Sequence, residues 1–232
     1  MSNKSHRQRI DAEKLTRWYN AQAAFYSARR DDFDGRHVRC VSGSLDPSQP
    51  LRILDAGCGT GLFTIGLAAS ASQWQVQGVD VASGMLEVGR RHAERKGLTN
   101  ASFCEGDVER LTFQDATFDA VVAAGLLPNL NSPHAALAEF HRVLKPAGRL
   151  FVVEIDRDGL SFLARLNFSL MVWGYRVIST VMPRFKFARG WNLERSTIDL
   201  SEIETALRAA AFLPRAVHRE TGHLIVEASR SE

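Results

Sequence analysis

The chain has 232 residues, of which 45% are hydrophobic and 24% are charged. This length and composition suit one globular domain, whose core is large enough to need no disulfide staples. A formal net charge of +3 at pH 7 is too small to indicate a nucleic-acid-binding protein by itself. The three cysteines are far apart and match no zinc-binding spacing, so neither a metal site nor a disulfide framework is predicted.

The sequence carries no clear signal for secretion or for a membrane span. Residues 1–10 are polar and basic, without the apolar centre of a secretory signal. Residues 160–183 form the most apolar stretch, but Arg165 and Arg176 interrupt it. Because a spanning helix needs about twenty nearly uncharged residues, we expect a cytoplasmic protein. Peripheral contact with a membrane through residues 160–183 stays open as an alternative.

Short apolar strands alternate with helices along most of the chain. A first helix is predicted over residues 11–27, and a loop rich in Ser, Pro and Gly over residues 43–50. Strands are predicted over residues 51–56, 75–79, 101–104, 118–123 and 149–155. Helices are predicted over residues 61–71, 83–96 and 135–143, with Gly97 ending the second and residues 145–148 stopping the third. This alternation predicts an α/β fold with a parallel sheet between two layers of helices.

The last thirty residues follow a different pattern. A helix is predicted over residues 201–211, followed by strands over residues 214–218 and 223–228 that Thr221-Gly222 joins. We expect these two strands to pair antiparallel at the sheet edge. The predicted fold is therefore Rossmann-like, with a seven-stranded, mostly parallel sheet and an antiparallel C-terminal hairpin.

The first predicted strand runs into a glycine loop and then into a helix, over the sequence Ile53-Leu54-Asp55-Ala56-Gly57-Cys58-Gly59-Thr60-Gly61. Glycine lets the backbone turn sharply and lets a ligand approach main-chain atoms. The helix that follows presents unpaired N–H groups to that ligand. The third glycine comes two residues after the second, rather than three as in the dinucleotide-binding fingerprint.

Three acidic residues lie at the ends of three successive predicted strands. Asp55 would repel a pyrophosphate but would suit the ammonium group of a bound methionine moiety. Asp80 is placed to accept hydrogen bonds from ribose hydroxyls, and Asp107 to accept one from an adenine amino group. A single Asp at a strand end is often only a helix cap. Three of them on the carboxyl edge of a sheet, where open α/β sheets bind ligands, indicate a nucleoside site.

These segments resemble the motifs of class I S-adenosylmethionine-dependent methyltransferases. Residues 53–68 resemble the first motif, Val79-Asp80 with residues 83–86 the next, and Gly106-Asp107-Val108 the adenine-side motif. Residues 119–129 and 142–148 resemble the later ones. The resemblance covers about residues 18–229. The most similar subgroup contains the ubiquinone and menaquinone biosynthesis C-methyltransferases.

The resemblance implies S-adenosylmethionine as cofactor and S-adenosylhomocysteine as product. Packing in the core is the alternative role for Met85 and Val108, since both residue types are often buried. Tyr19 and Tyr26 lie where relatives close a lid over the site, with helix packing as the alternative. The implied cofactor-binding residues are Asp55, Gly57, Gly59, Gly61, Asp80, Val81, Met85, Asp107, Val108 and Ala124.

Methyl transfer from a sulfonium needs mainly the positioning of two reactants and the exclusion of water. A general base is required only if the attacking atom must lose a proton. The favoured role of His134 is at a helix start, and that of His141 is structural. Residues 123–129 lack the Asn- or Asp-Pro-Pro-aromatic motif of amine-methylating nucleic-acid enzymes, so DNA and RNA substrates are not expected. The candidates for a catalytic role are Asn129, His134, Glu154, Asp156 and Tyr26.

The acceptor pocket is expected in an insert after the fifth strand, over residues 158–192. Apolar residues recur there at three- and four-residue steps, and Met171, Trp173 and Tyr175 are the candidate acceptor-binding residues. One interpretation is an apolar lid over a hydrophobic acceptor, with nearby arginines for a phosphate or carboxylate on it. The alternatives are a helix lying in a membrane surface and ordinary packing against the sheet or a homodimer partner.

A single methyltransferase domain is therefore expected. It divides into an N-terminal helical lid (1–45), a cofactor-binding core (46–156), an acceptor-side helical insert (157–195) and a C-terminal helix with edge strands (196–232). The expected activity is methyl transfer to a small apolar or lipid-like acceptor of the quinone, isoprenoid, polyketide or other secondary-metabolite type. Two alternatives stay open, namely methylation coupled to rearrangement of the acceptor, and a regulatory module that binds the cofactor without transferring methyl.

Overall fold

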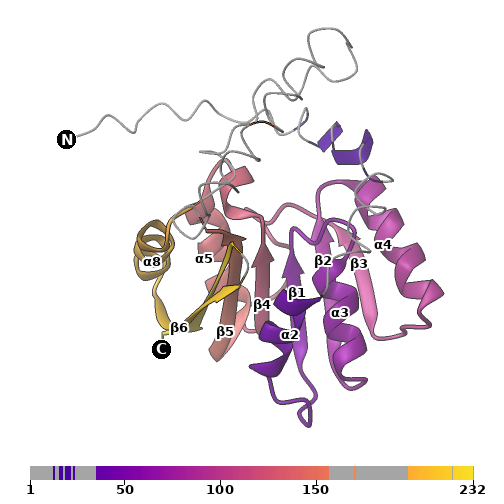
Figure 1. Cartoon of the computed structure of the whole chain (residues 1–232), viewed down its shortest axis with the longest axis horizontal. Coiled ribbons are helices and arrows are strands. Elements are labelled where there is room, and N and C mark those ends of the chain that lie inside the picture. The colour runs from indigo at the N-terminus through magenta and orange to yellow at the C-terminus, as the bar shows by residue number, and fades with distance from the viewer. Residues whose placement is uncertain are drawn as a thin grey trace, which may run out of the picture.

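A seven-stranded sheet runs through the molecule in the order β3-β2-β1-β4-β5-β7-β6 (Figure 1). The computed structural model describes residues 35–156, 198–220 and 222–231, with residues 13, 16, 17, 19–21, 23 and 170. Strands β1 to β5 are parallel, whereas β7 pairs antiparallel with both β5 and β6. The strands are β1 (Arg52–Ala56), β2 (Gln75–Asp80), β3 (Ala101–Glu105), β4 (Phe118–Ala124), β5 (Leu144–Ile155), β6 (Phe212–Glu220) and β7 (His223–Arg230).

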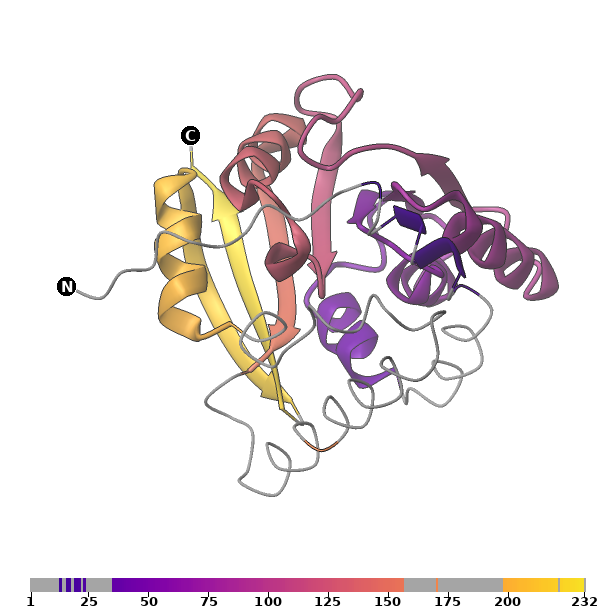
Figure 2. The ribbon, with the colours of Figure 1, turned by 90° about the horizontal axis from the view of Figure 1, so that it is seen from above.

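Helices cover both faces of this sheet (Figure 2). On one face α5 and α8 pack with Leu54, Val121 and Val152 of the strands. On the other face α2 and α3 pack with Ile53, Val122 and other strand residues. The helices are α2 (Arg36–Gly43), α3 (Leu62–Ser70), α4 (Ser83–Arg95), the short 3-10 helix η1 (Leu127–Asn129), α5 (Pro133–Val143) and α8 (Leu200–Ala209).

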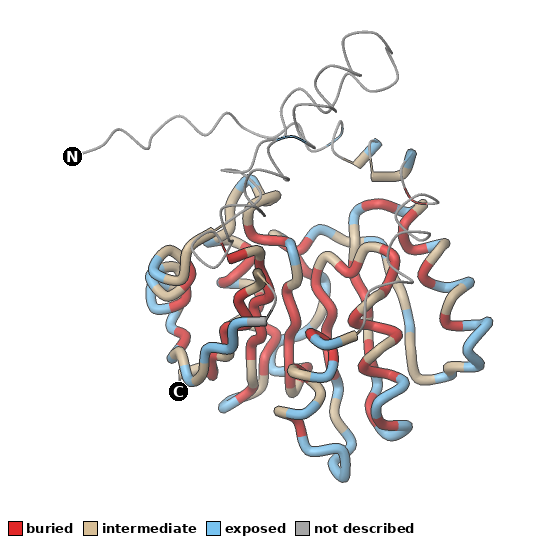
Figure 3. Tube along the Cα trace, in the orientation of Figure 1, coloured by how far each residue is buried: buried red, intermediate tan, exposed pale blue. Residues whose placement is uncertain are grey.

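The centre of the sheet is buried on both faces (Figure 3). In β4 the four consecutive residues 120–123 have no exposed surface. An uninterrupted apolar run is what a parallel strand between two helical layers requires. The predicted Rossmann-like sheet, with its five parallel strands and antiparallel C-terminal pair, is therefore confirmed.

Several predicted boundaries differ from the structure. Residues 145–148, expected only to stop a helix, belong to β5, which begins at Leu144 rather than at residue 149. Leu144 pairs with Phe118, and an irregularity in the ladder follows before Ala120 pairs with Arg149. Ala147 has φ +59°, so the backbone bends within the strand. The C-terminal strands are also longer than predicted, because β7 inserts between β5 and β6 and pairs along its whole length.

Helix α2 was not predicted at all. It follows Gly35, whose φ is +66°, and it buries His37, Val38 and Val41. A Cβ placed on Gly66 of α3 would lie 2.6 Å from Val38 Cγ1, so the two helices approach closely. The predicted N-terminal helix is seen in part, because residues 13, 16, 17, 19–21 and 23 are helical. The division into lid, core and insert stays a prediction.

Candidate functional site

The carboxyl ends of β1, β2 and β4 meet at one edge of the sheet, the upper edge in Figure 1. The glycine loop leaves β1 at this edge. Gly57, Gly59 and Gly61 all have left-handed backbones, with φ of +69°, +55° and +83°. The N–H groups of Gly57 and Cys58 both donate to the carbonyl of Val79, at 2.8 and 2.9 Å. The loop is therefore held against the end of β2 in a conformation that favours glycine.

Asp55 connects the glycine loop to the start of α3. Its side chain is 2% exposed, and Oδ2 accepts hydrogen bonds from the backbone N–H and the hydroxyl of Thr64, at 2.8 and 2.6 Å. The cap residue Gly61 has no side chain to offer, so Asp55 satisfies one of the unpaired N–H groups at this helix end. Sequence reasoning missed Thr64, although a hydroxyl residue three positions into a helix after a glycine loop is a usable signal.

Asp80 lies against the glycine loop from the end of β2. Oδ2 accepts the N–H of Gly59 at 2.9 Å, and Oδ1 accepts the N–H of Ala82 at 2.8 Å. Burial raises the pKa of the Asp80 carboxyl, and the backbone donors oppose this effect. An ionised carboxylate has about four acceptor positions, so the backbone donors of Gly59, Ala82 and Val81 leave capacity for a hydroxyl donor.

The remaining candidates of the adenine side divide into accessible and buried residues. Val81 is 40% exposed, and Asp107 is exposed with Oδ1 accepting the N–H of Glu109 at 2.9 Å. Met85 and Val108 are buried, in line with the packing role held open for both. The accessible groups at this end are thus an aliphatic side chain and a carboxylate.

Residues of the N-terminal segment lie at the start of α4, next to Asp80. Asn20 Oδ1 accepts the N–H of Gly84 at 2.7 Å. Ala23 is buried against Ala82 and Met85, and Tyr19 packs on the same cluster. The described N-terminal residues therefore pack on the start of α4, and their role as a lid stays a prediction. Sequence reasoning did not single out Asn20. Tyr26 lies outside the described residues.

A tight turn follows β4 at the same edge. Glu154 of β5 is 1% exposed, and its Oε1 accepts the N–H groups of Leu126 and Leu127, both at 2.9 Å. Burial raises the pKa of the Glu154 carboxyl to about 8, although the two backbone donors lower it. Asn129 Nδ2 donates to the carbonyl of Gly125 at 2.9 Å. Gly125 itself is exposed, and a Cβ there would meet nothing within 4 Å.

The other catalytic candidates are exposed, paired with another residue or outside the described residues. His134 is exposed in the first turn of α5, after the capping residue Ser132. Asp156 is buried, and its carboxylate pairs with Arg219 of β6. Met171, Trp173 and Tyr175 lie outside the described residues. Of the insert, the structure describes Leu170, which is 56% exposed.

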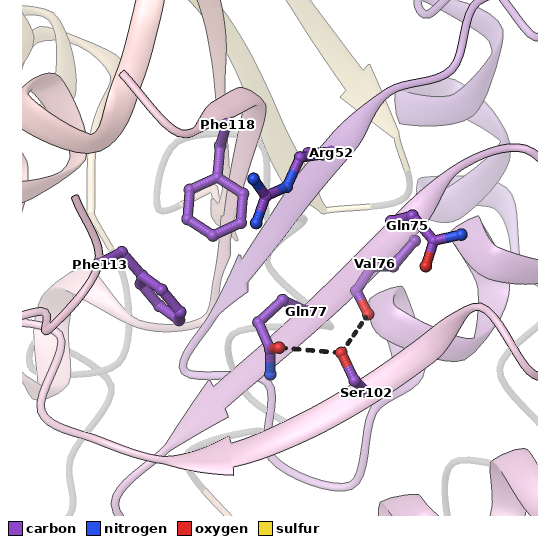
Figure 4. A pocket seen from close by; sticks show the side chains of 7 residues that line it. All are labelled: Arg52, Gln75, Val76, Gln77, Ser102, Phe113 and Phe118. Atoms are coloured by element: carbon purple, nitrogen blue, oxygen red, sulfur yellow. Dashed lines mark hydrogen bonds between the residues drawn. The ribbon is translucent and has the colours of Figure 1, made fainter. Parts of the chain in front are cut away.

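A cavity of about 220 Å³ lies at the opposite, amino-terminal edge of the sheet (Figure 4). Arg52, at the start of β1, lies over the ring of Phe118 with 5.8 Å from guanidinium carbon to ring centroid. Ser102 Oγ donates to Gln77 Oε1 at 2.9 Å. These polar groups are thus partly paired with one another, and the cavity is separate from the glycine loop. Among the described residues no cluster could hold a metal ion, and no helix has the length and hydropathy needed to cross a bilayer.

The polar groups at the carboxyl edge, mainly carboxylate acceptors, suit a nucleoside with a cationic amino-acid tail. Left-handed glycines keep the loop backbone open to a ligand, and a Cβ on Gly57 would clash with Leu126 Cδ1 at 2.6 Å. Around the loop lie carboxylates rather than the phosphate-binding groups of a dinucleotide site. A family model described as a methyltransferase domain matches residues 53–148, which contain the glycine loop, Asp80, Asp107 and the turn after β4. Fold and site together define a class I methyltransferase, an enzyme whose cofactor is S-adenosylmethionine.

Comparison with known proteins identifies the family within this class to which the chain belongs. The chain is 30% identical over 224 residues to a ubiquinone/menaquinone biosynthesis C-methyltransferase of Ectopseudomonas mendocina, covering 92% of this chain and 87% of the relative. It is 44% identical over 116 residues to a demethylmenaquinone methyltransferase of Thermus thermophilus, covering 50% of this chain and 52% of the relative. The chain belongs to the family of ubiquinone and menaquinone biosynthesis methyltransferases.

The fold is shared with enzymes of much lower sequence identity. The magnesium protoporphyrin IX methyltransferase of Synechocystis, solved with bound S-adenosylhomocysteine, superposes with a TM-score of 0.67. It is 20% identical, and the match covers 95% of this chain and all of that one. At this identity the likeness concerns the fold alone.

Proposed function

We propose that this enzyme methylates a small, apolar, quinone-type acceptor in its reduced, phenolic form. The names of the relatives support a quinone-type acceptor. The reduced form follows from chemistry, because the displacement needs an electron-rich attacking atom and an oxidised quinone is electron-poor. Bound S-adenosylmethionine supplies a methyl group already activated on a sulfonium. The chain's own residues then bind and orient the two reactants and exclude water from the site.

The observation that carries the proposal is the pairing of the glycine loop with Asp80. In this proposal the loop of Gly57, Gly59 and Gly61 takes the methionine part of the cofactor, and Asp55 holds the loop's shape through Thr64. Asp80 accepts from the ribose hydroxyls with the acceptor positions that the backbone leaves available.

The adenine lies between Val81 and Asp107 in this proposal. Both side chains are accessible at the carboxyl edge. Met85 and Val108 form the buried layer beneath them. Ala124 and Gly125, at the end of β4, line the floor next to the reacting centre, and the exposed Gly125 leaves open space for the acceptor.

The acceptor is proposed to contact the insert of residues 157–195, with Met171, Trp173 and Tyr175 as its apolar contacts. The exposure of Leu170, a large apolar residue of that insert, supports an apolar surface there. Replacing both Met171 and Trp173 by Ala is then expected to raise the KM for the acceptor more than the Kd for the cofactor. Equal losses of both would assign the insert to the scaffold instead.

The test of the proposed function is turnover with a defined acceptor. Purified enzyme, S-adenosylmethionine and a demethylated naphthoquinone are incubated with and without a chemical reductant, and S-adenosylhomocysteine is quantified. Product formation in the reduced sample alone supports the proposal, and the product's carbon skeleton shows whether methylation is coupled to rearrangement. If the enzyme binds S-adenosylmethionine but converts no reduced quinone, phenol or catechol, the acceptor assignment is refuted while the cofactor assignment stands.

A further inference from the structure

Glu154 is a buried carboxyl group that cofactor recognition does not use. It lies in β5 beside Leu224 of β7, on the sheet face that α5 and α8 cover, and it is 1% exposed. Among the described residues, two N–H groups donate hydrogen bonds to Glu154, and both donate to the same oxygen, Oε1. A carboxyl group kept in such a place needs a physical reason, because burying a charge is costly.

The two N–H groups that Glu154 accepts belong to the turn after β4. Leu126 is the cap residue of η1 and Leu127 is its first residue. N–H groups in the first turn of a helix have no partner within the helix. Leu126 and Leu127 are both buried, hence water does not readily satisfy these donors. Glu154 therefore holds the turn by its backbone, independently of the side chains that the turn carries.

The position of this turn bears directly on the cofactor loop. Leu126 Cδ1 lies 2.6 Å from where a Cβ of Gly57 would be, so the Leu126 side chain fills the space beside the first glycine. The neighbouring Gly125 donates its N–H to Val153 of β5 at 2.8 Å. A continuous set of contacts thus runs from β5, through Glu154 and the turn, to the glycine loop of β1.

We propose that Glu154 is a positioning residue for methyl transfer. Through Oε1 it holds residues 125–127 against the glycine loop, so that the floor beneath the reacting centre exists before either reactant binds. It acts by accepting two backbone hydrogen bonds and exchanges no proton with the acceptor. Preformed geometry of this kind lowers the cost of bringing two reactants into line. The inference deepens the proposed function and rests on it for the identity of the acceptor alone.

Two substitutions at this position separate positioning from proton transfer. In Glu154→Gln the amide oxygen can still accept both N–H groups, whereas Glu154→Leu removes the acceptor and keeps a similar volume. We expect the Gln variant to retain kcat/KM within about threefold and the Leu variant to lose about tenfold or more, since two buried donors are left unpaired. Glu227→Leu, which removes a partly buried carboxylate bound to Arg149 on the other face of the sheet, is the matched control.

Hydrogen exchange provides a readout that needs no acceptor. The amides of Leu126 and Leu127 should be protected in the wild type and in Glu154→Gln, and should exchange about tenfold faster or more in Glu154→Leu. The Kd for S-adenosylhomocysteine should rise in Glu154→Leu and stay unchanged in Glu227→Leu. These two measurements also separate the inference from the proposed function, because both hold even if no quinone is converted.

Three outcomes would overturn the inference. One is a Gln variant as inactive as the Leu variant, which would show that the carboxyl exchanges a proton. Another is a Leu variant with unchanged exchange and activity. If Glu154→Leu does not fold, Leu126→Ala replaces it, because it removes the side chain beside Gly57 and leaves the backbone bonds intact. An unchanged Kd for S-adenosylhomocysteine in that variant would be the third contrary outcome.

Discussion

The buried Glu154 carboxyl makes the stability of this protein depend on pH in a direction opposite to that of most acidic residues. Burial raises its pKa from 4.5 to about 8 in the folded state. The group therefore contributes fully to stability below pH 4.5, and this contribution is lost as the pH rises towards 8. At about 1.36 kcal/mol per pH unit, the interval corresponds to about 5 kcal/mol. The side chain is 1% exposed, so solvent screening reduces this figure little.

Glu154→Gln removes the titration and keeps the hydrogen-bond acceptor. Relative to wild type, its free energy of unfolding should rise steadily between pH 5 and pH 8, by several kcal/mol in total. Urea denaturation at half-unit pH steps measures this, with unchanged m-values as the check that both proteins unfold in one step.

Glu139→Gln is the matched control for this experiment. The hydrogen bond from Arg142 lowers the pKa of the Glu139 carboxyl, so its contribution is lost only as the pH falls through the acid range. The difference between this variant and wild type should stay constant between pH 5 and pH 8. A constant difference for Glu154→Gln as well would refute the reasoning, because it would mean that the buried carboxyl ionises as easily in the folded as in the unfolded chain.

Three further substitutions test the cofactor site. Asp80→Ala should weaken S-adenosylmethionine binding by about 2–4 kcal/mol while the protein stays folded, since two charge-assisted hydrogen bonds are lost; calorimetric binding unchanged in a folded variant would contradict this. Gly57→Ala should abolish measurable cofactor binding, because the new Cβ meets Leu126 at 2.6 Å and the φ of +69° disfavours a side chain. Combining it with Leu126→Ala should restore part of the stability measured by thermal unfolding. No restoration would show that the clash is not the cause. Asn20→Ala removes the acceptor for the Gly84 N–H at 2.7 Å and should lower the free energy of unfolding by about 0.5–2 kcal/mol. The loss should be seen as faster hydrogen exchange of the Gly84 amide and a weaker cofactor complex. An unchanged exchange rate would argue against this contact.

Sequence reasoning placed Asp55 and Asp80 beside the glycine loop because all three stand at strand ends, and the structure brings them together there. Parallel strands end at a common edge, so Asp55 and Asp80, each at the end of a predicted strand, had to come near the glycine loop. The roles of these acids were harder to predict. Asp55 is bonded to Thr64 in α3, and Asp80 holds the N–H groups of Gly59 and Ala82. Both therefore shape the loop in addition to any contact with a ligand.

The sequence by itself determined the order of the strands and of the helices between them, the glycine loop, the antiparallel C-terminal pair and the enzyme family, but not helix α2. These features follow from local periodicity and short motifs, which a linear pattern carries. Only the tertiary structure decided which side chains hold the site in place. Glu154 meets Leu126 across 28 positions of sequence, and Asn20 meets Gly84 across 64. Such partners come together because separate elements pack on one another, and no local pattern in either segment records the other.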